Sequence, residues 1–570
     1  MRTHLVVLAL LACPTLALLA PASPAQTTMH AFQGTQGSEL HGHSVANAGD
    51  FDGDGFDDVI VGSPYYDKSL FPNPGTLVDA GRATVRSGAT GATLFSISGG
   101  ASGDRLGFDV DGAGDVNADG FADVVIGIPG KDFAGFDSGG FAVYLGPSGA
   151  LQHEVTQAST LTSNFGWSVA GCGDANNDGY DDVVIGSPFD TTLSLLPDMG
   201  EVYVYDVFHK FLLSQVSSGQ AGAHLGWSVD GAGDIDGDGR ADIIAGAPDY
   251  DSMTPAADDS GLVVILSAAT PVMTTLESIP GPPTPDGQFG YAVAGAGLID
   301  GDGVPDLVVG SPGVIANTGS VSILSGSGGG TINTVLGQTT GERYGSSVAG
   351  NADFNRDGLP DVIVGAPSYD VGVQTNRGRI EVCTAATGAL LYEASALSGG
   401  QIGFAVDIGA NTDVDARAEI LYGAPYNDET ATNAGASFVV SSSNAFAAWS
   451  NYGTGLAGTL GVPSLEVDGS PSLGTVMSMV LGSSAPATAP GILAVGIAQQ
   501  SVAFKGGTML VVPLLQIGVS VPTGTTALPF LVPSAPLLLG ADTYVQLWMA
   551  DTGAPVNVAL SPGLQLTFGD

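Results

Sequence analysis

A glycine and an acidic loop recur seven times in this chain at a fixed separation. Each glycine is followed eight residues later by the first position of a nine-residue loop, and each loop leads into a short apolar run that ends in Gly-x-Pro. The loop starts are 55 to 65 residues apart, whereas the offset from glycine to loop never changes. A constant short spacing inside a variable long one indicates a rigid hairpin that is repeated as a structural unit. The glycines are Gly42, Gly107, Gly166, Gly226, Gly290, Gly345 and Gly403, and the loops start at Asp50, Asp115, Asp174, Asp234, Leu298, Asp353 and Asn411.

The runs between these loops have the composition of β-strands. Those that follow the loops, such as VIVGSP and IIAGAP, are short and rich in Val and Ile, which favours buried strands over helices. Four strands in each of seven units predict an all-β fold, a seven-bladed β-propeller. Residues 30–33 align with residues 95–98 when Gly42 is matched to Gly107. We therefore expect the N-terminal strand to complete the last blade and to protect the closing seam.

The N-terminus and the cysteines indicate where the protein acts. Residues 1–25 contain Arg2, an apolar stretch and a run of small residues, which is typical of a secretory signal peptide. We therefore expect a secreted or cell-surface protein; a lipoprotein cleavage site at Cys13 is the alternative. No later stretch has the features of a membrane helix, so a transmembrane span is not expected. Cys172 and Cys383 lie in different units and are expected to be buried free thiols.

The net charge of -43 is distributed unevenly and separates two domains. Residues 26–449 carry 52 acidic and 12 basic residues, whereas residues 450–570 carry five acidic residues and one lysine. The first segment is expected to be the propeller, and because so acidic a surface repels phosphate, a nucleic-acid partner is not expected. The second segment alternates apolar runs with Gly, Pro and Ser turns, which predicts a small antiparallel β-sandwich. It resembles the C-terminal modules of bacterial secreted repeat proteins, which implies export, attachment to the cell surface or assembly; an ordinary accessory domain is the alternative.

The acidic loops follow the pattern D-x-[DN]-x-D-G-x-x-D, which is suited to a cation. In the first loop, Asp50, Asp52, Asp54 and Asp58 alternate in a way that turns their carboxylates towards one centre, and Phe56 offers its backbone carbonyl. The glycine at the sixth position permits the tight backbone that this requires. Hard oxygen ligands favour Ca²⁺ over Zn²⁺, which prefers nitrogen and sulfur. Without an ion, carboxylates about 4 Å apart repel each other by roughly 4 kcal/mol, so we expect the metal to be part of the folded state.

The same positions recur in the other loops. The predicted ligand sets are Asp115, Asn117, Asp119, Phe121 and Asp123; Asp174, Asn176, Asp178, Tyr180 and Asp182; Asp234, Asp236, Asp238, Arg240 and Asp242; Asp300, Asp302, Val304 and Asp306; and Asp353, Asn355, Asp357, Leu359 and Asp361. The fifth loop has Leu298 at its first position and should bind more weakly. The seventh has Asn411, Asp413, Asp415 and Glu419, but Ala416 replaces its glycine. We expect about five to six Ca²⁺ ions.

Two alternatives to this interpretation are an acidic turn without an ion and an EF-hand. An EF-hand requires flanking helices and a glutamate at position twelve, and the runs after these loops are expected to be strands.

The repeat resembles the FG-GAP family, the calcium-binding blades of the integrin alpha-chain propeller. The resemblance covers residues 29 to about 446. Phe165-Gly166 and Phe289-Gly290 match the first half of the motif, and Gly246-Ala247-Pro248 and Gly365-Ala366-Pro367 match the second half. The resemblance implies that the calcium loops share one face of the ring and that ligands dock on the opposite face.

The loops after Gly-x-Pro are the candidate recognition surface. They carry Tyr65, Tyr66, Phe133, Phe189, Tyr250, Tyr369 and Tyr426. Such aromatic side chains stack on sugar rings or anchor a protein partner, but their recurrence favours packing between blades. The predicted function is therefore binding of a protein or glycan ligand in adhesion or recognition. A calcium-dependent polysaccharide lyase or hydrolase and a structural envelope component are the alternatives.

Catalytic residues are not predicted. Gly42-His43-Ser44 superficially resembles a nucleophile elbow, but glycine-x-Ser-Val recurs in other units, which makes Ser44 a repeat position in a strand. His41 and His43 are then expected to be exposed strand or loop residues.

Overall fold

The computed structural model describes residues 28–441 apart from nine short segments, and beyond residue 447 it describes eleven strands. The nine segments are 71–74, 134–135, 159–161, 192–195, 252–258, 269–272, 371–374, 396–399 and 413–417. The expected signal peptide, Cys13 and the loop residues Asp413 and Asp415 lie outside the described residues. The chain divides into two compact units, one covering Thr27–Ser442 and the other including Ser443–Asp570. The domain boundaries expected from the sequence stay predictions.

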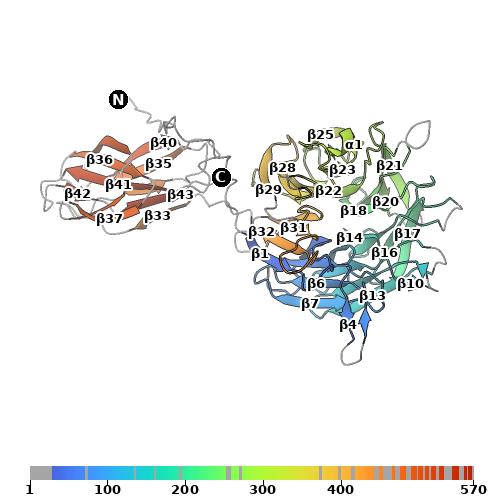
Figure 1. Ribbon diagram of the computed structural model, residues 1–570. Helices are drawn as coiled ribbons and strands as arrows, with labels where there is room; N and C mark the ends of the chain where they lie inside the picture. Colours follow the sequence, from blue (N-terminus) through green and yellow to red (C-terminus); the bar gives the residue numbers. More distant parts are fainter. Residues whose placement is uncertain are drawn as a thin grey trace. The chain divides into compact units, whose positions relative to one another are not determined.

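The first unit contains seven four-stranded antiparallel sheets, which are the blades of the predicted propeller (Figure 1). Blades are numbered from the N-terminus, and their strands are given from the channel outwards. Blades 1 to 3 are β2 (Val45–Gly49), β3 (Asp58–Ser63), β6 (Arg82–Arg86) and β7 (Thr93–Ser98); β8 (Val110–Gly114), β9 (Asp123–Gly127), β12 (Gly140–Leu145) and β13 (Ala150–Thr156); and β14 (Ser168–Gly173), β15 (Asp182–Ser187), β16 (Glu201–Asp206) and β17 (Phe211–Ser217).

Blades 4 to 7 repeat the arrangement. They are β18 (Ser228–Gly233), β19 (Asp242–Ala247), β20 (Leu262–Ser267) and β21 (Thr274–Pro280); β22 (Ala292–Gly297), β23 (Asp306–Ser311), β24 (Ser320–Leu324) and β25 (Thr331–Leu336); β26 (Ser347–Ala352), β27 (Asp361–Ala366), β28 (Arg379–Thr384) and β29 (Leu390–Ser395); and β30 (Val406–Ala410), β31 (Glu419–Ala424), β32 (Ala436–Val440) and β1 (Thr28–Gln33). The second strand of every blade is completely buried. Burial on both faces explains why these runs are continuously apolar.

The ring closes through the N-terminal strand, as predicted. β1 pairs antiparallel with β32, so that Phe32 lies opposite Ser437 and Gln33 opposite Ala436. Figure 1 shows β1 beside β32 and β31, where the first and last parts of the unit meet. The innermost strands of successive blades are in contact all the way round, and β30 of blade 7 contacts β2 of blade 1. Backbone hydrogen bonds within blade 7 therefore join the first strand of the ring to the last.

The two glycines of the repeat meet across neighbouring blades. A Cβ added to Gly62 of blade 1 would lie 2.2 Å from the carbonyl oxygen of Gly107 in blade 2, and one added to Gly246 would lie 1.9 Å from that of Gly290. The last glycine of the ring, Gly423, approaches Gly42 of blade 1 in the same way, at 1.9 Å. Real Cβ atoms do not come so close to backbone, so both positions must be glycine for the blades to reach their observed spacing.

The hydrophobic core consists of separate clusters between neighbouring blades. One cluster combines Ala46, Ile60 and Val85 of blade 1 with Val124 and Ile126 of blade 2, and each following pair of blades has its own. The cluster between blades 7 and 1 contains Phe32 from β1. Each blade is therefore stabilised by apolar contacts with both of its neighbours.

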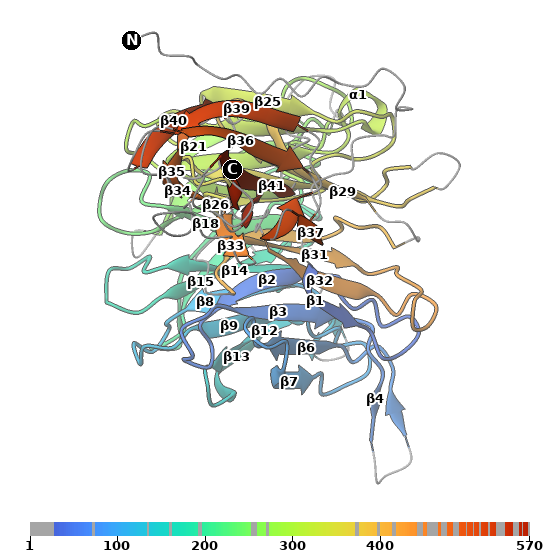
Figure 2. The same cartoon turned by 90° about the vertical axis from the view of Figure 1, so that its left-hand side faces the viewer.

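Short elements extend the connections outside the blades. Blade 1 carries a ribbon of β4 (Lys68–Ser69) and β5 (Thr76–Leu77), and β4 stands out from the ring in both views (Figure 1 and Figure 2). Blade 2 carries β10 (Asp132–Phe133) paired with β11 (Phe136–Asp137), and blade 5 carries a single helical turn, α1 (Val314–Asn317). Cys172 and Cys383 are buried free thiols, which confirms the prediction. None of the helices in the described part of the chain is long and apolar enough to cross a membrane.

The described residues of the second unit form three antiparallel sheets. The largest pairs β33 (Ala448–Tyr452), β43 (Gly563–Thr567), β41 (Asp542–Ala550), β36 (Ala489–Gly496) and β39 (Leu515–Val521), with β42 (Val558–Leu560) also on β41. The others pair β34 (Leu465–Asp468), β35 (Val476–Gly482) and β40 (Thr525–Leu531), and β37 (Gln499–Phe504) and β38 (Gly507–Val511). The all-β prediction holds for this unit, and its arrangement as a sandwich stays a prediction.

The contact between glycines makes a direct prediction for stability. The substitution Gly246→Ala should lower the free energy of unfolding by about 1 to 3 kcal/mol or more, because the added methyl group meets backbone that cannot rotate away. Gly330→Ala is the matched control, since a Cβ there has no neighbour within 4 Å. Both variants are compared with the parent protein by thermal and urea unfolding. Equal stability of the two variants would show that the blades can move apart at no cost.

Candidate metal centres and central channel

The acidic loops connect the first and second strands of each blade. The loop of blade 1 joins β2 to β3, and that of blade 4 joins β18 to β19. In the described residues the elements flanking these loops are strands, which excludes the EF-hand alternative. The sixth-position glycine has a φ of 92° at Gly55 and 85° at Gly239, the left-handed backbone that the sequence predicts.

Hydrogen bonds hold the loop carboxylates in the same arrangement in different blades. The first-position carboxylate accepts the N–H of the sixth-position glycine, as in Asp50 and Gly55 at 3.0 Å. The third-position side chain accepts the N–H of the fifth residue, as in Asp52 and Asp54 at 3.1 Å. The fifth-position carboxylate accepts the N–H of the seventh residue, Phe56, at 2.9 Å. Alternate side chains therefore fold back over the loop, as their spacing implies.

The ninth-position carboxylate is buried and holds the loop against the blade. Asp58 Oδ2 accepts the N–H groups of Phe51 and Asp52 at 3.0 and 3.2 Å, and its Oδ1 accepts that of Gly88, which follows β6, at 3.1 Å. Asp123 and Asp306 make the corresponding bonds to Gly146 and Gly326. This residue therefore has a structural role in addition to any contact with a metal.

Burial makes these ninth-position carboxylates hard to ionise without a cation. Loss of hydration raises the pKa of Asp58, Asp123 and Asp361 to about 7, that of Asp182 to about 8 and that of Asp242 to about 6. Neighbouring acids add to the effect, as Asp52 does for Asp58. A bound divalent ion would compensate this cost.

In each of two loops, three carboxylates come close enough together to bind one ion. Asp50, Asp52 and Asp58 offer oxygen atoms that all lie within 4.8 Å of one another, and so do Asp234, Asp236 and Asp242. Oxygen atoms bound to a common Ca²⁺ at 2.3 to 2.6 Å lie at most about 5 Å apart. The fifth-position residues Asp54 and Asp238 are not in these two groups.

Buried oxygen atoms without partners point to the same chemistry. Oδ1 of Asp182, of Asp242 and of Asp361 is buried and has no hydrogen-bond partner. Such oxygen atoms are costly to bury unless a ligand occupies them. The donor set therefore fits a hard divalent cation.

The fifth and seventh loops differ from the others in the way the sequence indicates. Leu298 is 49% exposed and offers no carboxylate, whereas Asp300 Oδ1 still accepts the N–H of Asp302 at 2.9 Å. In the seventh loop, Glu419 Oε2 accepts the N–H of Thr412 at 2.8 Å, the bond made elsewhere by the ninth-position aspartate. Whether either loop holds a metal stays a prediction, as do the carbonyl ligands at the seventh position.

A central channel is the second candidate site, and the sequence analysis did not identify it. The seven innermost strands enclose a cavity of about 300 Å³. The residue after each repeat glycine lies at its rim, and in six of seven blades that residue has an aromatic or imidazole ring; the rim residues are His43, Phe108, Trp167, Trp227, Tyr291, Ser346 and Phe404. Neighbouring rings touch, with centroids 4.7 Å apart for His43 and Phe108 and 5.2 Å for Trp167 and Trp227.

This rim lies at the end of the strands that is remote from the acidic loops. Trp167 precedes β14, and the acidic loop of blade 3 follows the other end of that strand. Phe189, which follows the second strand of the same blade, packs on Trp167 with ring centroids 5.4 Å apart. Tyr426 packs on Phe404 in the same way, at 6.2 Å. The loops after Gly-x-Pro and the aromatic rim therefore share one face.

Carboxylates line the channel below the aromatic rim. Asp109, Asp111, Asp230 and Asp407 all border the cavity. Backbone N–H groups hold them in place: Val169 donates to Asp109 at 2.9 Å, and Gly295 donates to Asp230 at 3.0 Å. Burial and then mutual repulsion raise the pKa of Asp111 well above its usual range, while burial raises that of Asp230 to about 7 and that of Asp407 to about 6. The channel therefore favours a cationic guest.

The structure corrects the expectation that His41 and His43 are exposed. His41 is 2% exposed and contacts the hydroxyl groups of Ser63 and Ser437, and burial lowers its pKa to about 3. His43 is partly buried at the rim, where its Nδ1 lies 2.9 Å from the carbonyl oxygen of Phe108. Both residues sit where neighbouring blades meet, which spacing within one repeat does not reveal.

The aromatic residues after Gly-x-Pro mostly pack against the blades. Tyr250 and Tyr369 contact the clusters between blades 3 and 4 and between blades 5 and 6. The ring of Tyr66 lies 4.1 Å from the guanidinium carbon of Arg82. The contacts of Tyr250 and Tyr369 agree with the favoured interpretation of packing between blades, whereas Tyr66 packs on a residue of its own blade. Phe189 and Tyr426 extend the channel rim. The side chain of Phe133 lies outside the described residues.

Five of the blades match a known repeat family. Residues 41–85, 165–205, 225–266, 289–324 and 344–382 match the FG-GAP repeat. The chain carries FG-GAP repeats. Blades 2 and 7 fall outside the matched residues, but the glycine contacts of Gly127 and Gly423 follow the same pattern.

Integrin alpha chains are among the similar proteins. The chain is 34% identical to integrin alpha pat-2 of Caenorhabditis elegans over 224 residues, which cover 35% of this chain and 18% of that protein. It is 36% identical to integrin alpha-6 of Gallus gallus over 160 residues, covering 27% and 14%. The chain thus spans about a fifth or less of the length of these curated relatives. A solved structure of the Dos1 propeller aligns with a TM-score of 0.38 and 10% identity, covering 73% of this chain and 95% of that one.

The channel carboxylates predict a specific dependence of stability on pH. Because the pKa of these aspartates is higher in the folded than in the unfolded protein, they add to the free energy of unfolding near pH 4. This contribution is lost as the pH rises through their folded-state pKa, here about 6 to 7 and above. Asp111→Asn removes one such charge and keeps an acceptor for the N–H of Gly171. The variant should therefore unfold at a higher temperature than the parent protein at pH 8 and at nearly the same temperature at pH 5.

The control for this measurement is Asp132→Asn, an exposed aspartate outside the channel. Calorimetry in saturating calcium keeps the acidic loops in one state. A stabilisation by Asp111→Asn that is equal at both pH values would rule out charge repulsion in the channel as its cause.

Proposed function

We propose that this FG-GAP repeat protein is a secreted or cell-surface binding module whose propeller is stabilised by Ca²⁺. Its ligand is a protein that inserts a basic side chain into the mouth of the central channel. One observation carries the proposal: an aromatic rim surrounds a cavity lined by Asp109, Asp111, Asp230 and Asp407. Aromatic faces attract cations, and the carboxylates below supply a complementary charge.

The position of the rim and the overall charge support the same conclusion. The rim faces away from the acidic loops, the side on which the integrin resemblance implies docking. The net charge of -43 attracts a basic partner over long distances and repels nucleic acid. A basic group would also relieve the repulsion among the channel carboxylates and lower the cost of keeping them ionised.

A glycan is the second candidate ligand, because aromatic rings in contact such as Trp167 and Trp227 are also able to stack on sugar rings. The carboxylates beneath the rim favour the basic protein side chain over a neutral sugar. We propose binding without turnover in either case.

The calcium part of the proposal is tested with two substitutions in one loop. Asp54→Asn alters an exposed fifth-position ligand and should leave the stability in chelator within about 0.5 kcal/mol of the parent protein. Asp58→Asn should cost about 1 to 3 kcal/mol even in chelator, because an amide NH₂ cannot accept the N–H of Gly88. In calcium, both variants should bind one ion fewer than the parent protein.

Calorimetry with calcium and with chelator, together with metal analysis, measures these effects. We expect about five to six bound ions in the parent protein and a large fall in unfolding temperature when they are removed. A parent protein that is free of metal and equally stable in chelator would exclude calcium as a structural ion.

Ligand binding is tested with arrayed arginine- and lysine-containing peptides and with neutral oligosaccharides. The parent protein in calcium should retain basic peptides, and Trp227→Ala and Asp230→Asn should each weaken retention at least tenfold. Phe211→Ala, which changes a residue that is 48% exposed on the outer strand of blade 3, should leave it unchanged. Retention of neutral oligosaccharides alone would favour the glycan ligand. New reducing ends or unsaturated sugars in a polysaccharide digest would instead establish the lyase or hydrolase alternative.

A further inference from the structure

Blade 3 differs from the other blades at one buried position. Val183 pairs with Tyr205 between β15 and β16, so the next residues along, Asp182 and Asp206, lie opposite each other. The corresponding partner of the ninth-position aspartate is Ser267 in blade 4 and Thr384 in blade 6. Asp182 and Asp206 are 0% and 1% exposed. Blade 3 therefore buries two facing carboxylates where these blades bury one.

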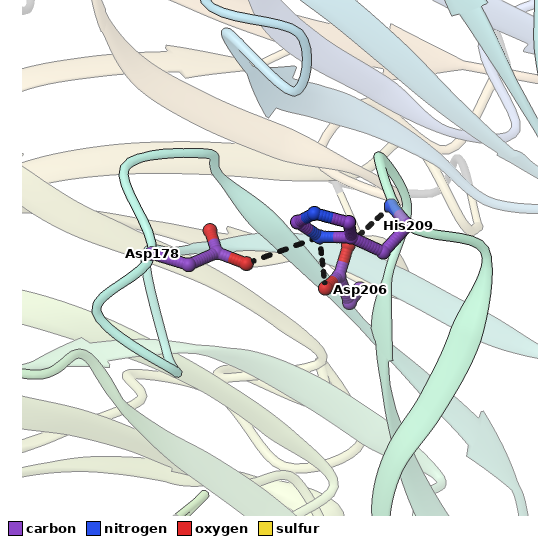
Figure 3. A group of neighbouring side chains, drawn as sticks. All are labelled: Asp178, Asp206 and His209. Atoms are coloured by element: carbon purple, nitrogen blue, oxygen red, sulfur yellow. Dashed lines mark hydrogen bonds and ion pairs between the residues drawn. The ribbon is translucent and has the colours of Figure 1, made fainter.

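A histidine and a further carboxylate form a cluster with Asp206 (Figure 3). The turn after β16 brings His209 Nδ1 to 2.8 Å from Asp206 Oδ2 and to 3.3 Å from Asp178 Oδ2. Asp178 reaches the cluster from the acidic loop, as Figure 3 shows, while its Oδ1 accepts the N–H of Tyr180. The donor atoms of these three side chains all lie within 4.8 Å of one another.

Aromatic stacking fixes the orientation of the imidazole. The rings of Tyr180 and Phe208 are parallel, with centroids 3.8 Å apart. The imidazole of His209 stands nearly perpendicular to both rings, at 5.8 and 5.1 Å. The stack joins the acidic loop to the turn that carries His209, which holds the nitrogen and carboxylate donors in register. Such preorganisation reduces the cost of ordering side chains around an ion.

Two buried oxygen atoms beside the cluster have no hydrogen-bond partner within the protein. A single Nδ1–H faces two carboxylates, and Oδ1 of the buried Asp182 has no hydrogen-bond partner. Asn176 donates from Nδ2 to Asp206 Oδ2 at 3.4 Å, and its buried Oδ1 is also without a partner. Buried oxygen atoms without a hydrogen-bond donor indicate a bound ligand that accepts electron pairs.

The distances within the cluster match the coordination shell of a small metal ion. Donors bound at 2.0 to 2.2 Å in tetrahedral or octahedral geometry are separated by about 2.8 to 3.6 Å. The two contacts of His209 Nδ1, at 2.8 and 3.3 Å, fall in this range. A nitrogen donor among carboxylates favours Zn²⁺ and similar borderline ions over Ca²⁺, which takes oxygen ligands.

We propose that Asp178, Asp206 and His209 form a binding site for Zn²⁺ or a chemically similar divalent transition-metal ion in blade 3, with the buried Asp182 facing Asp206 across the strand pair. The site shares Asp178 with the Ca²⁺ ligands predicted for the blade 3 loop and adds Asp206 and His209, whereas Asp174 at the first loop position lies outside it. Asp178 directs Oδ2 towards His209 while its Oδ1 accepts the N–H of Tyr180, so a change at Asp174 distinguishes this site from the calcium loop.

Cobalt titration of the mature chain, residues 26–570, tests the proposal. In excess calcium, one equivalent of Co²⁺ should produce visible absorption bands, and Zn²⁺ should displace it. His209→Gln should weaken Co²⁺ binding by roughly 100-fold or more, because it removes a residue that binds the metal directly. Loss of a residue that only hydrogen-bonds to a metal ligand already weakens binding about 10- to 100-fold. His224→Gln is the matched control: His224 also contacts an aspartate, Asp249, at 2.7 Å. It should bind Co²⁺ like the parent protein.

Two further variants separate this site from the calcium loop and from misfolding. Asp174→Asn should lose one Ca²⁺ and retain Co²⁺, whereas His209→Gln should lose Co²⁺ and retain the calcium count and the unfolding temperature. Because the side chain of His209 is 48% exposed, its substitution leaves the blade folded. Co²⁺ binding by His209→Gln with parental affinity, or no Co²⁺ retained by the parent protein, would overturn the proposal and leave the cluster as a hydrogen-bonded triad only.

Discussion

The propeller depends on the contact of bare backbone between neighbouring blades. The glycine near the end of the second strand of one blade meets the glycine that precedes the first strand of the next, as Gly62 meets Gly107, with no room for a side chain. This approach sets the spacing of all seven sheets. The spacing in turn sets the thickness of the apolar clusters between blades and the width of the central cavity. The motif is therefore a packing constraint first, and the functional surfaces follow from the geometry that it imposes.

Negative charge is concentrated in two parts of the propeller, the acidic loops and the central channel, and the carboxylates have different surroundings in each. In the acidic loops, backbone N–H groups surround the carboxylates, as around Asp58, yet oxygen atoms such as Asp242 Oδ1 remain without a partner. In the channel, four aspartates face a common space and raise each other's cost of ionisation. Both arrangements carry an electrostatic cost that a cation would offset, which in our proposal is a metal ion in the loops and a basic side chain in the channel.

Much of the fold could be predicted because it is encoded locally. The offset from Gly42 to Asp50, the Val- and Ile-rich runs and the alignment of residues 30–33 with 95–98 all lie within one repeat, and they led to the correct number of blades and to the strand that closes the ring. The loop residues could be named for the same reason, since alternation over nine positions determines which side chains fold inwards.

The channel and the blade 3 cluster could not be predicted in this way. Rim neighbours such as Phe108 and Trp167 are 59 residues apart and meet only once the blades are assembled. The rim position changes among His, Phe, Trp, Tyr and Ser, so it does not stand out as a motif, although its aromatic character becomes visible once the repeats are aligned on their glycines. His41 shows the converse: a polar residue near a loop is buried because a neighbouring blade covers it.

The pairing of β1 with β32 also determines the order in which the molecule is completed. Thr28 and Val440 are neighbours in one sheet although more than four hundred residues separate them in the chain. During synthesis, and during any passage through a membrane pore, the N-terminal strand emerges first and must wait for its partner until the seventh blade has appeared. Six blades are able to form progressively by pairing nearby strands, whereas the final one requires the two ends to find each other. A nascent chain of this protein therefore has an unpaired strand edge until β32 of blade 7 has been made, and a chain truncated before β32 keeps that edge exposed.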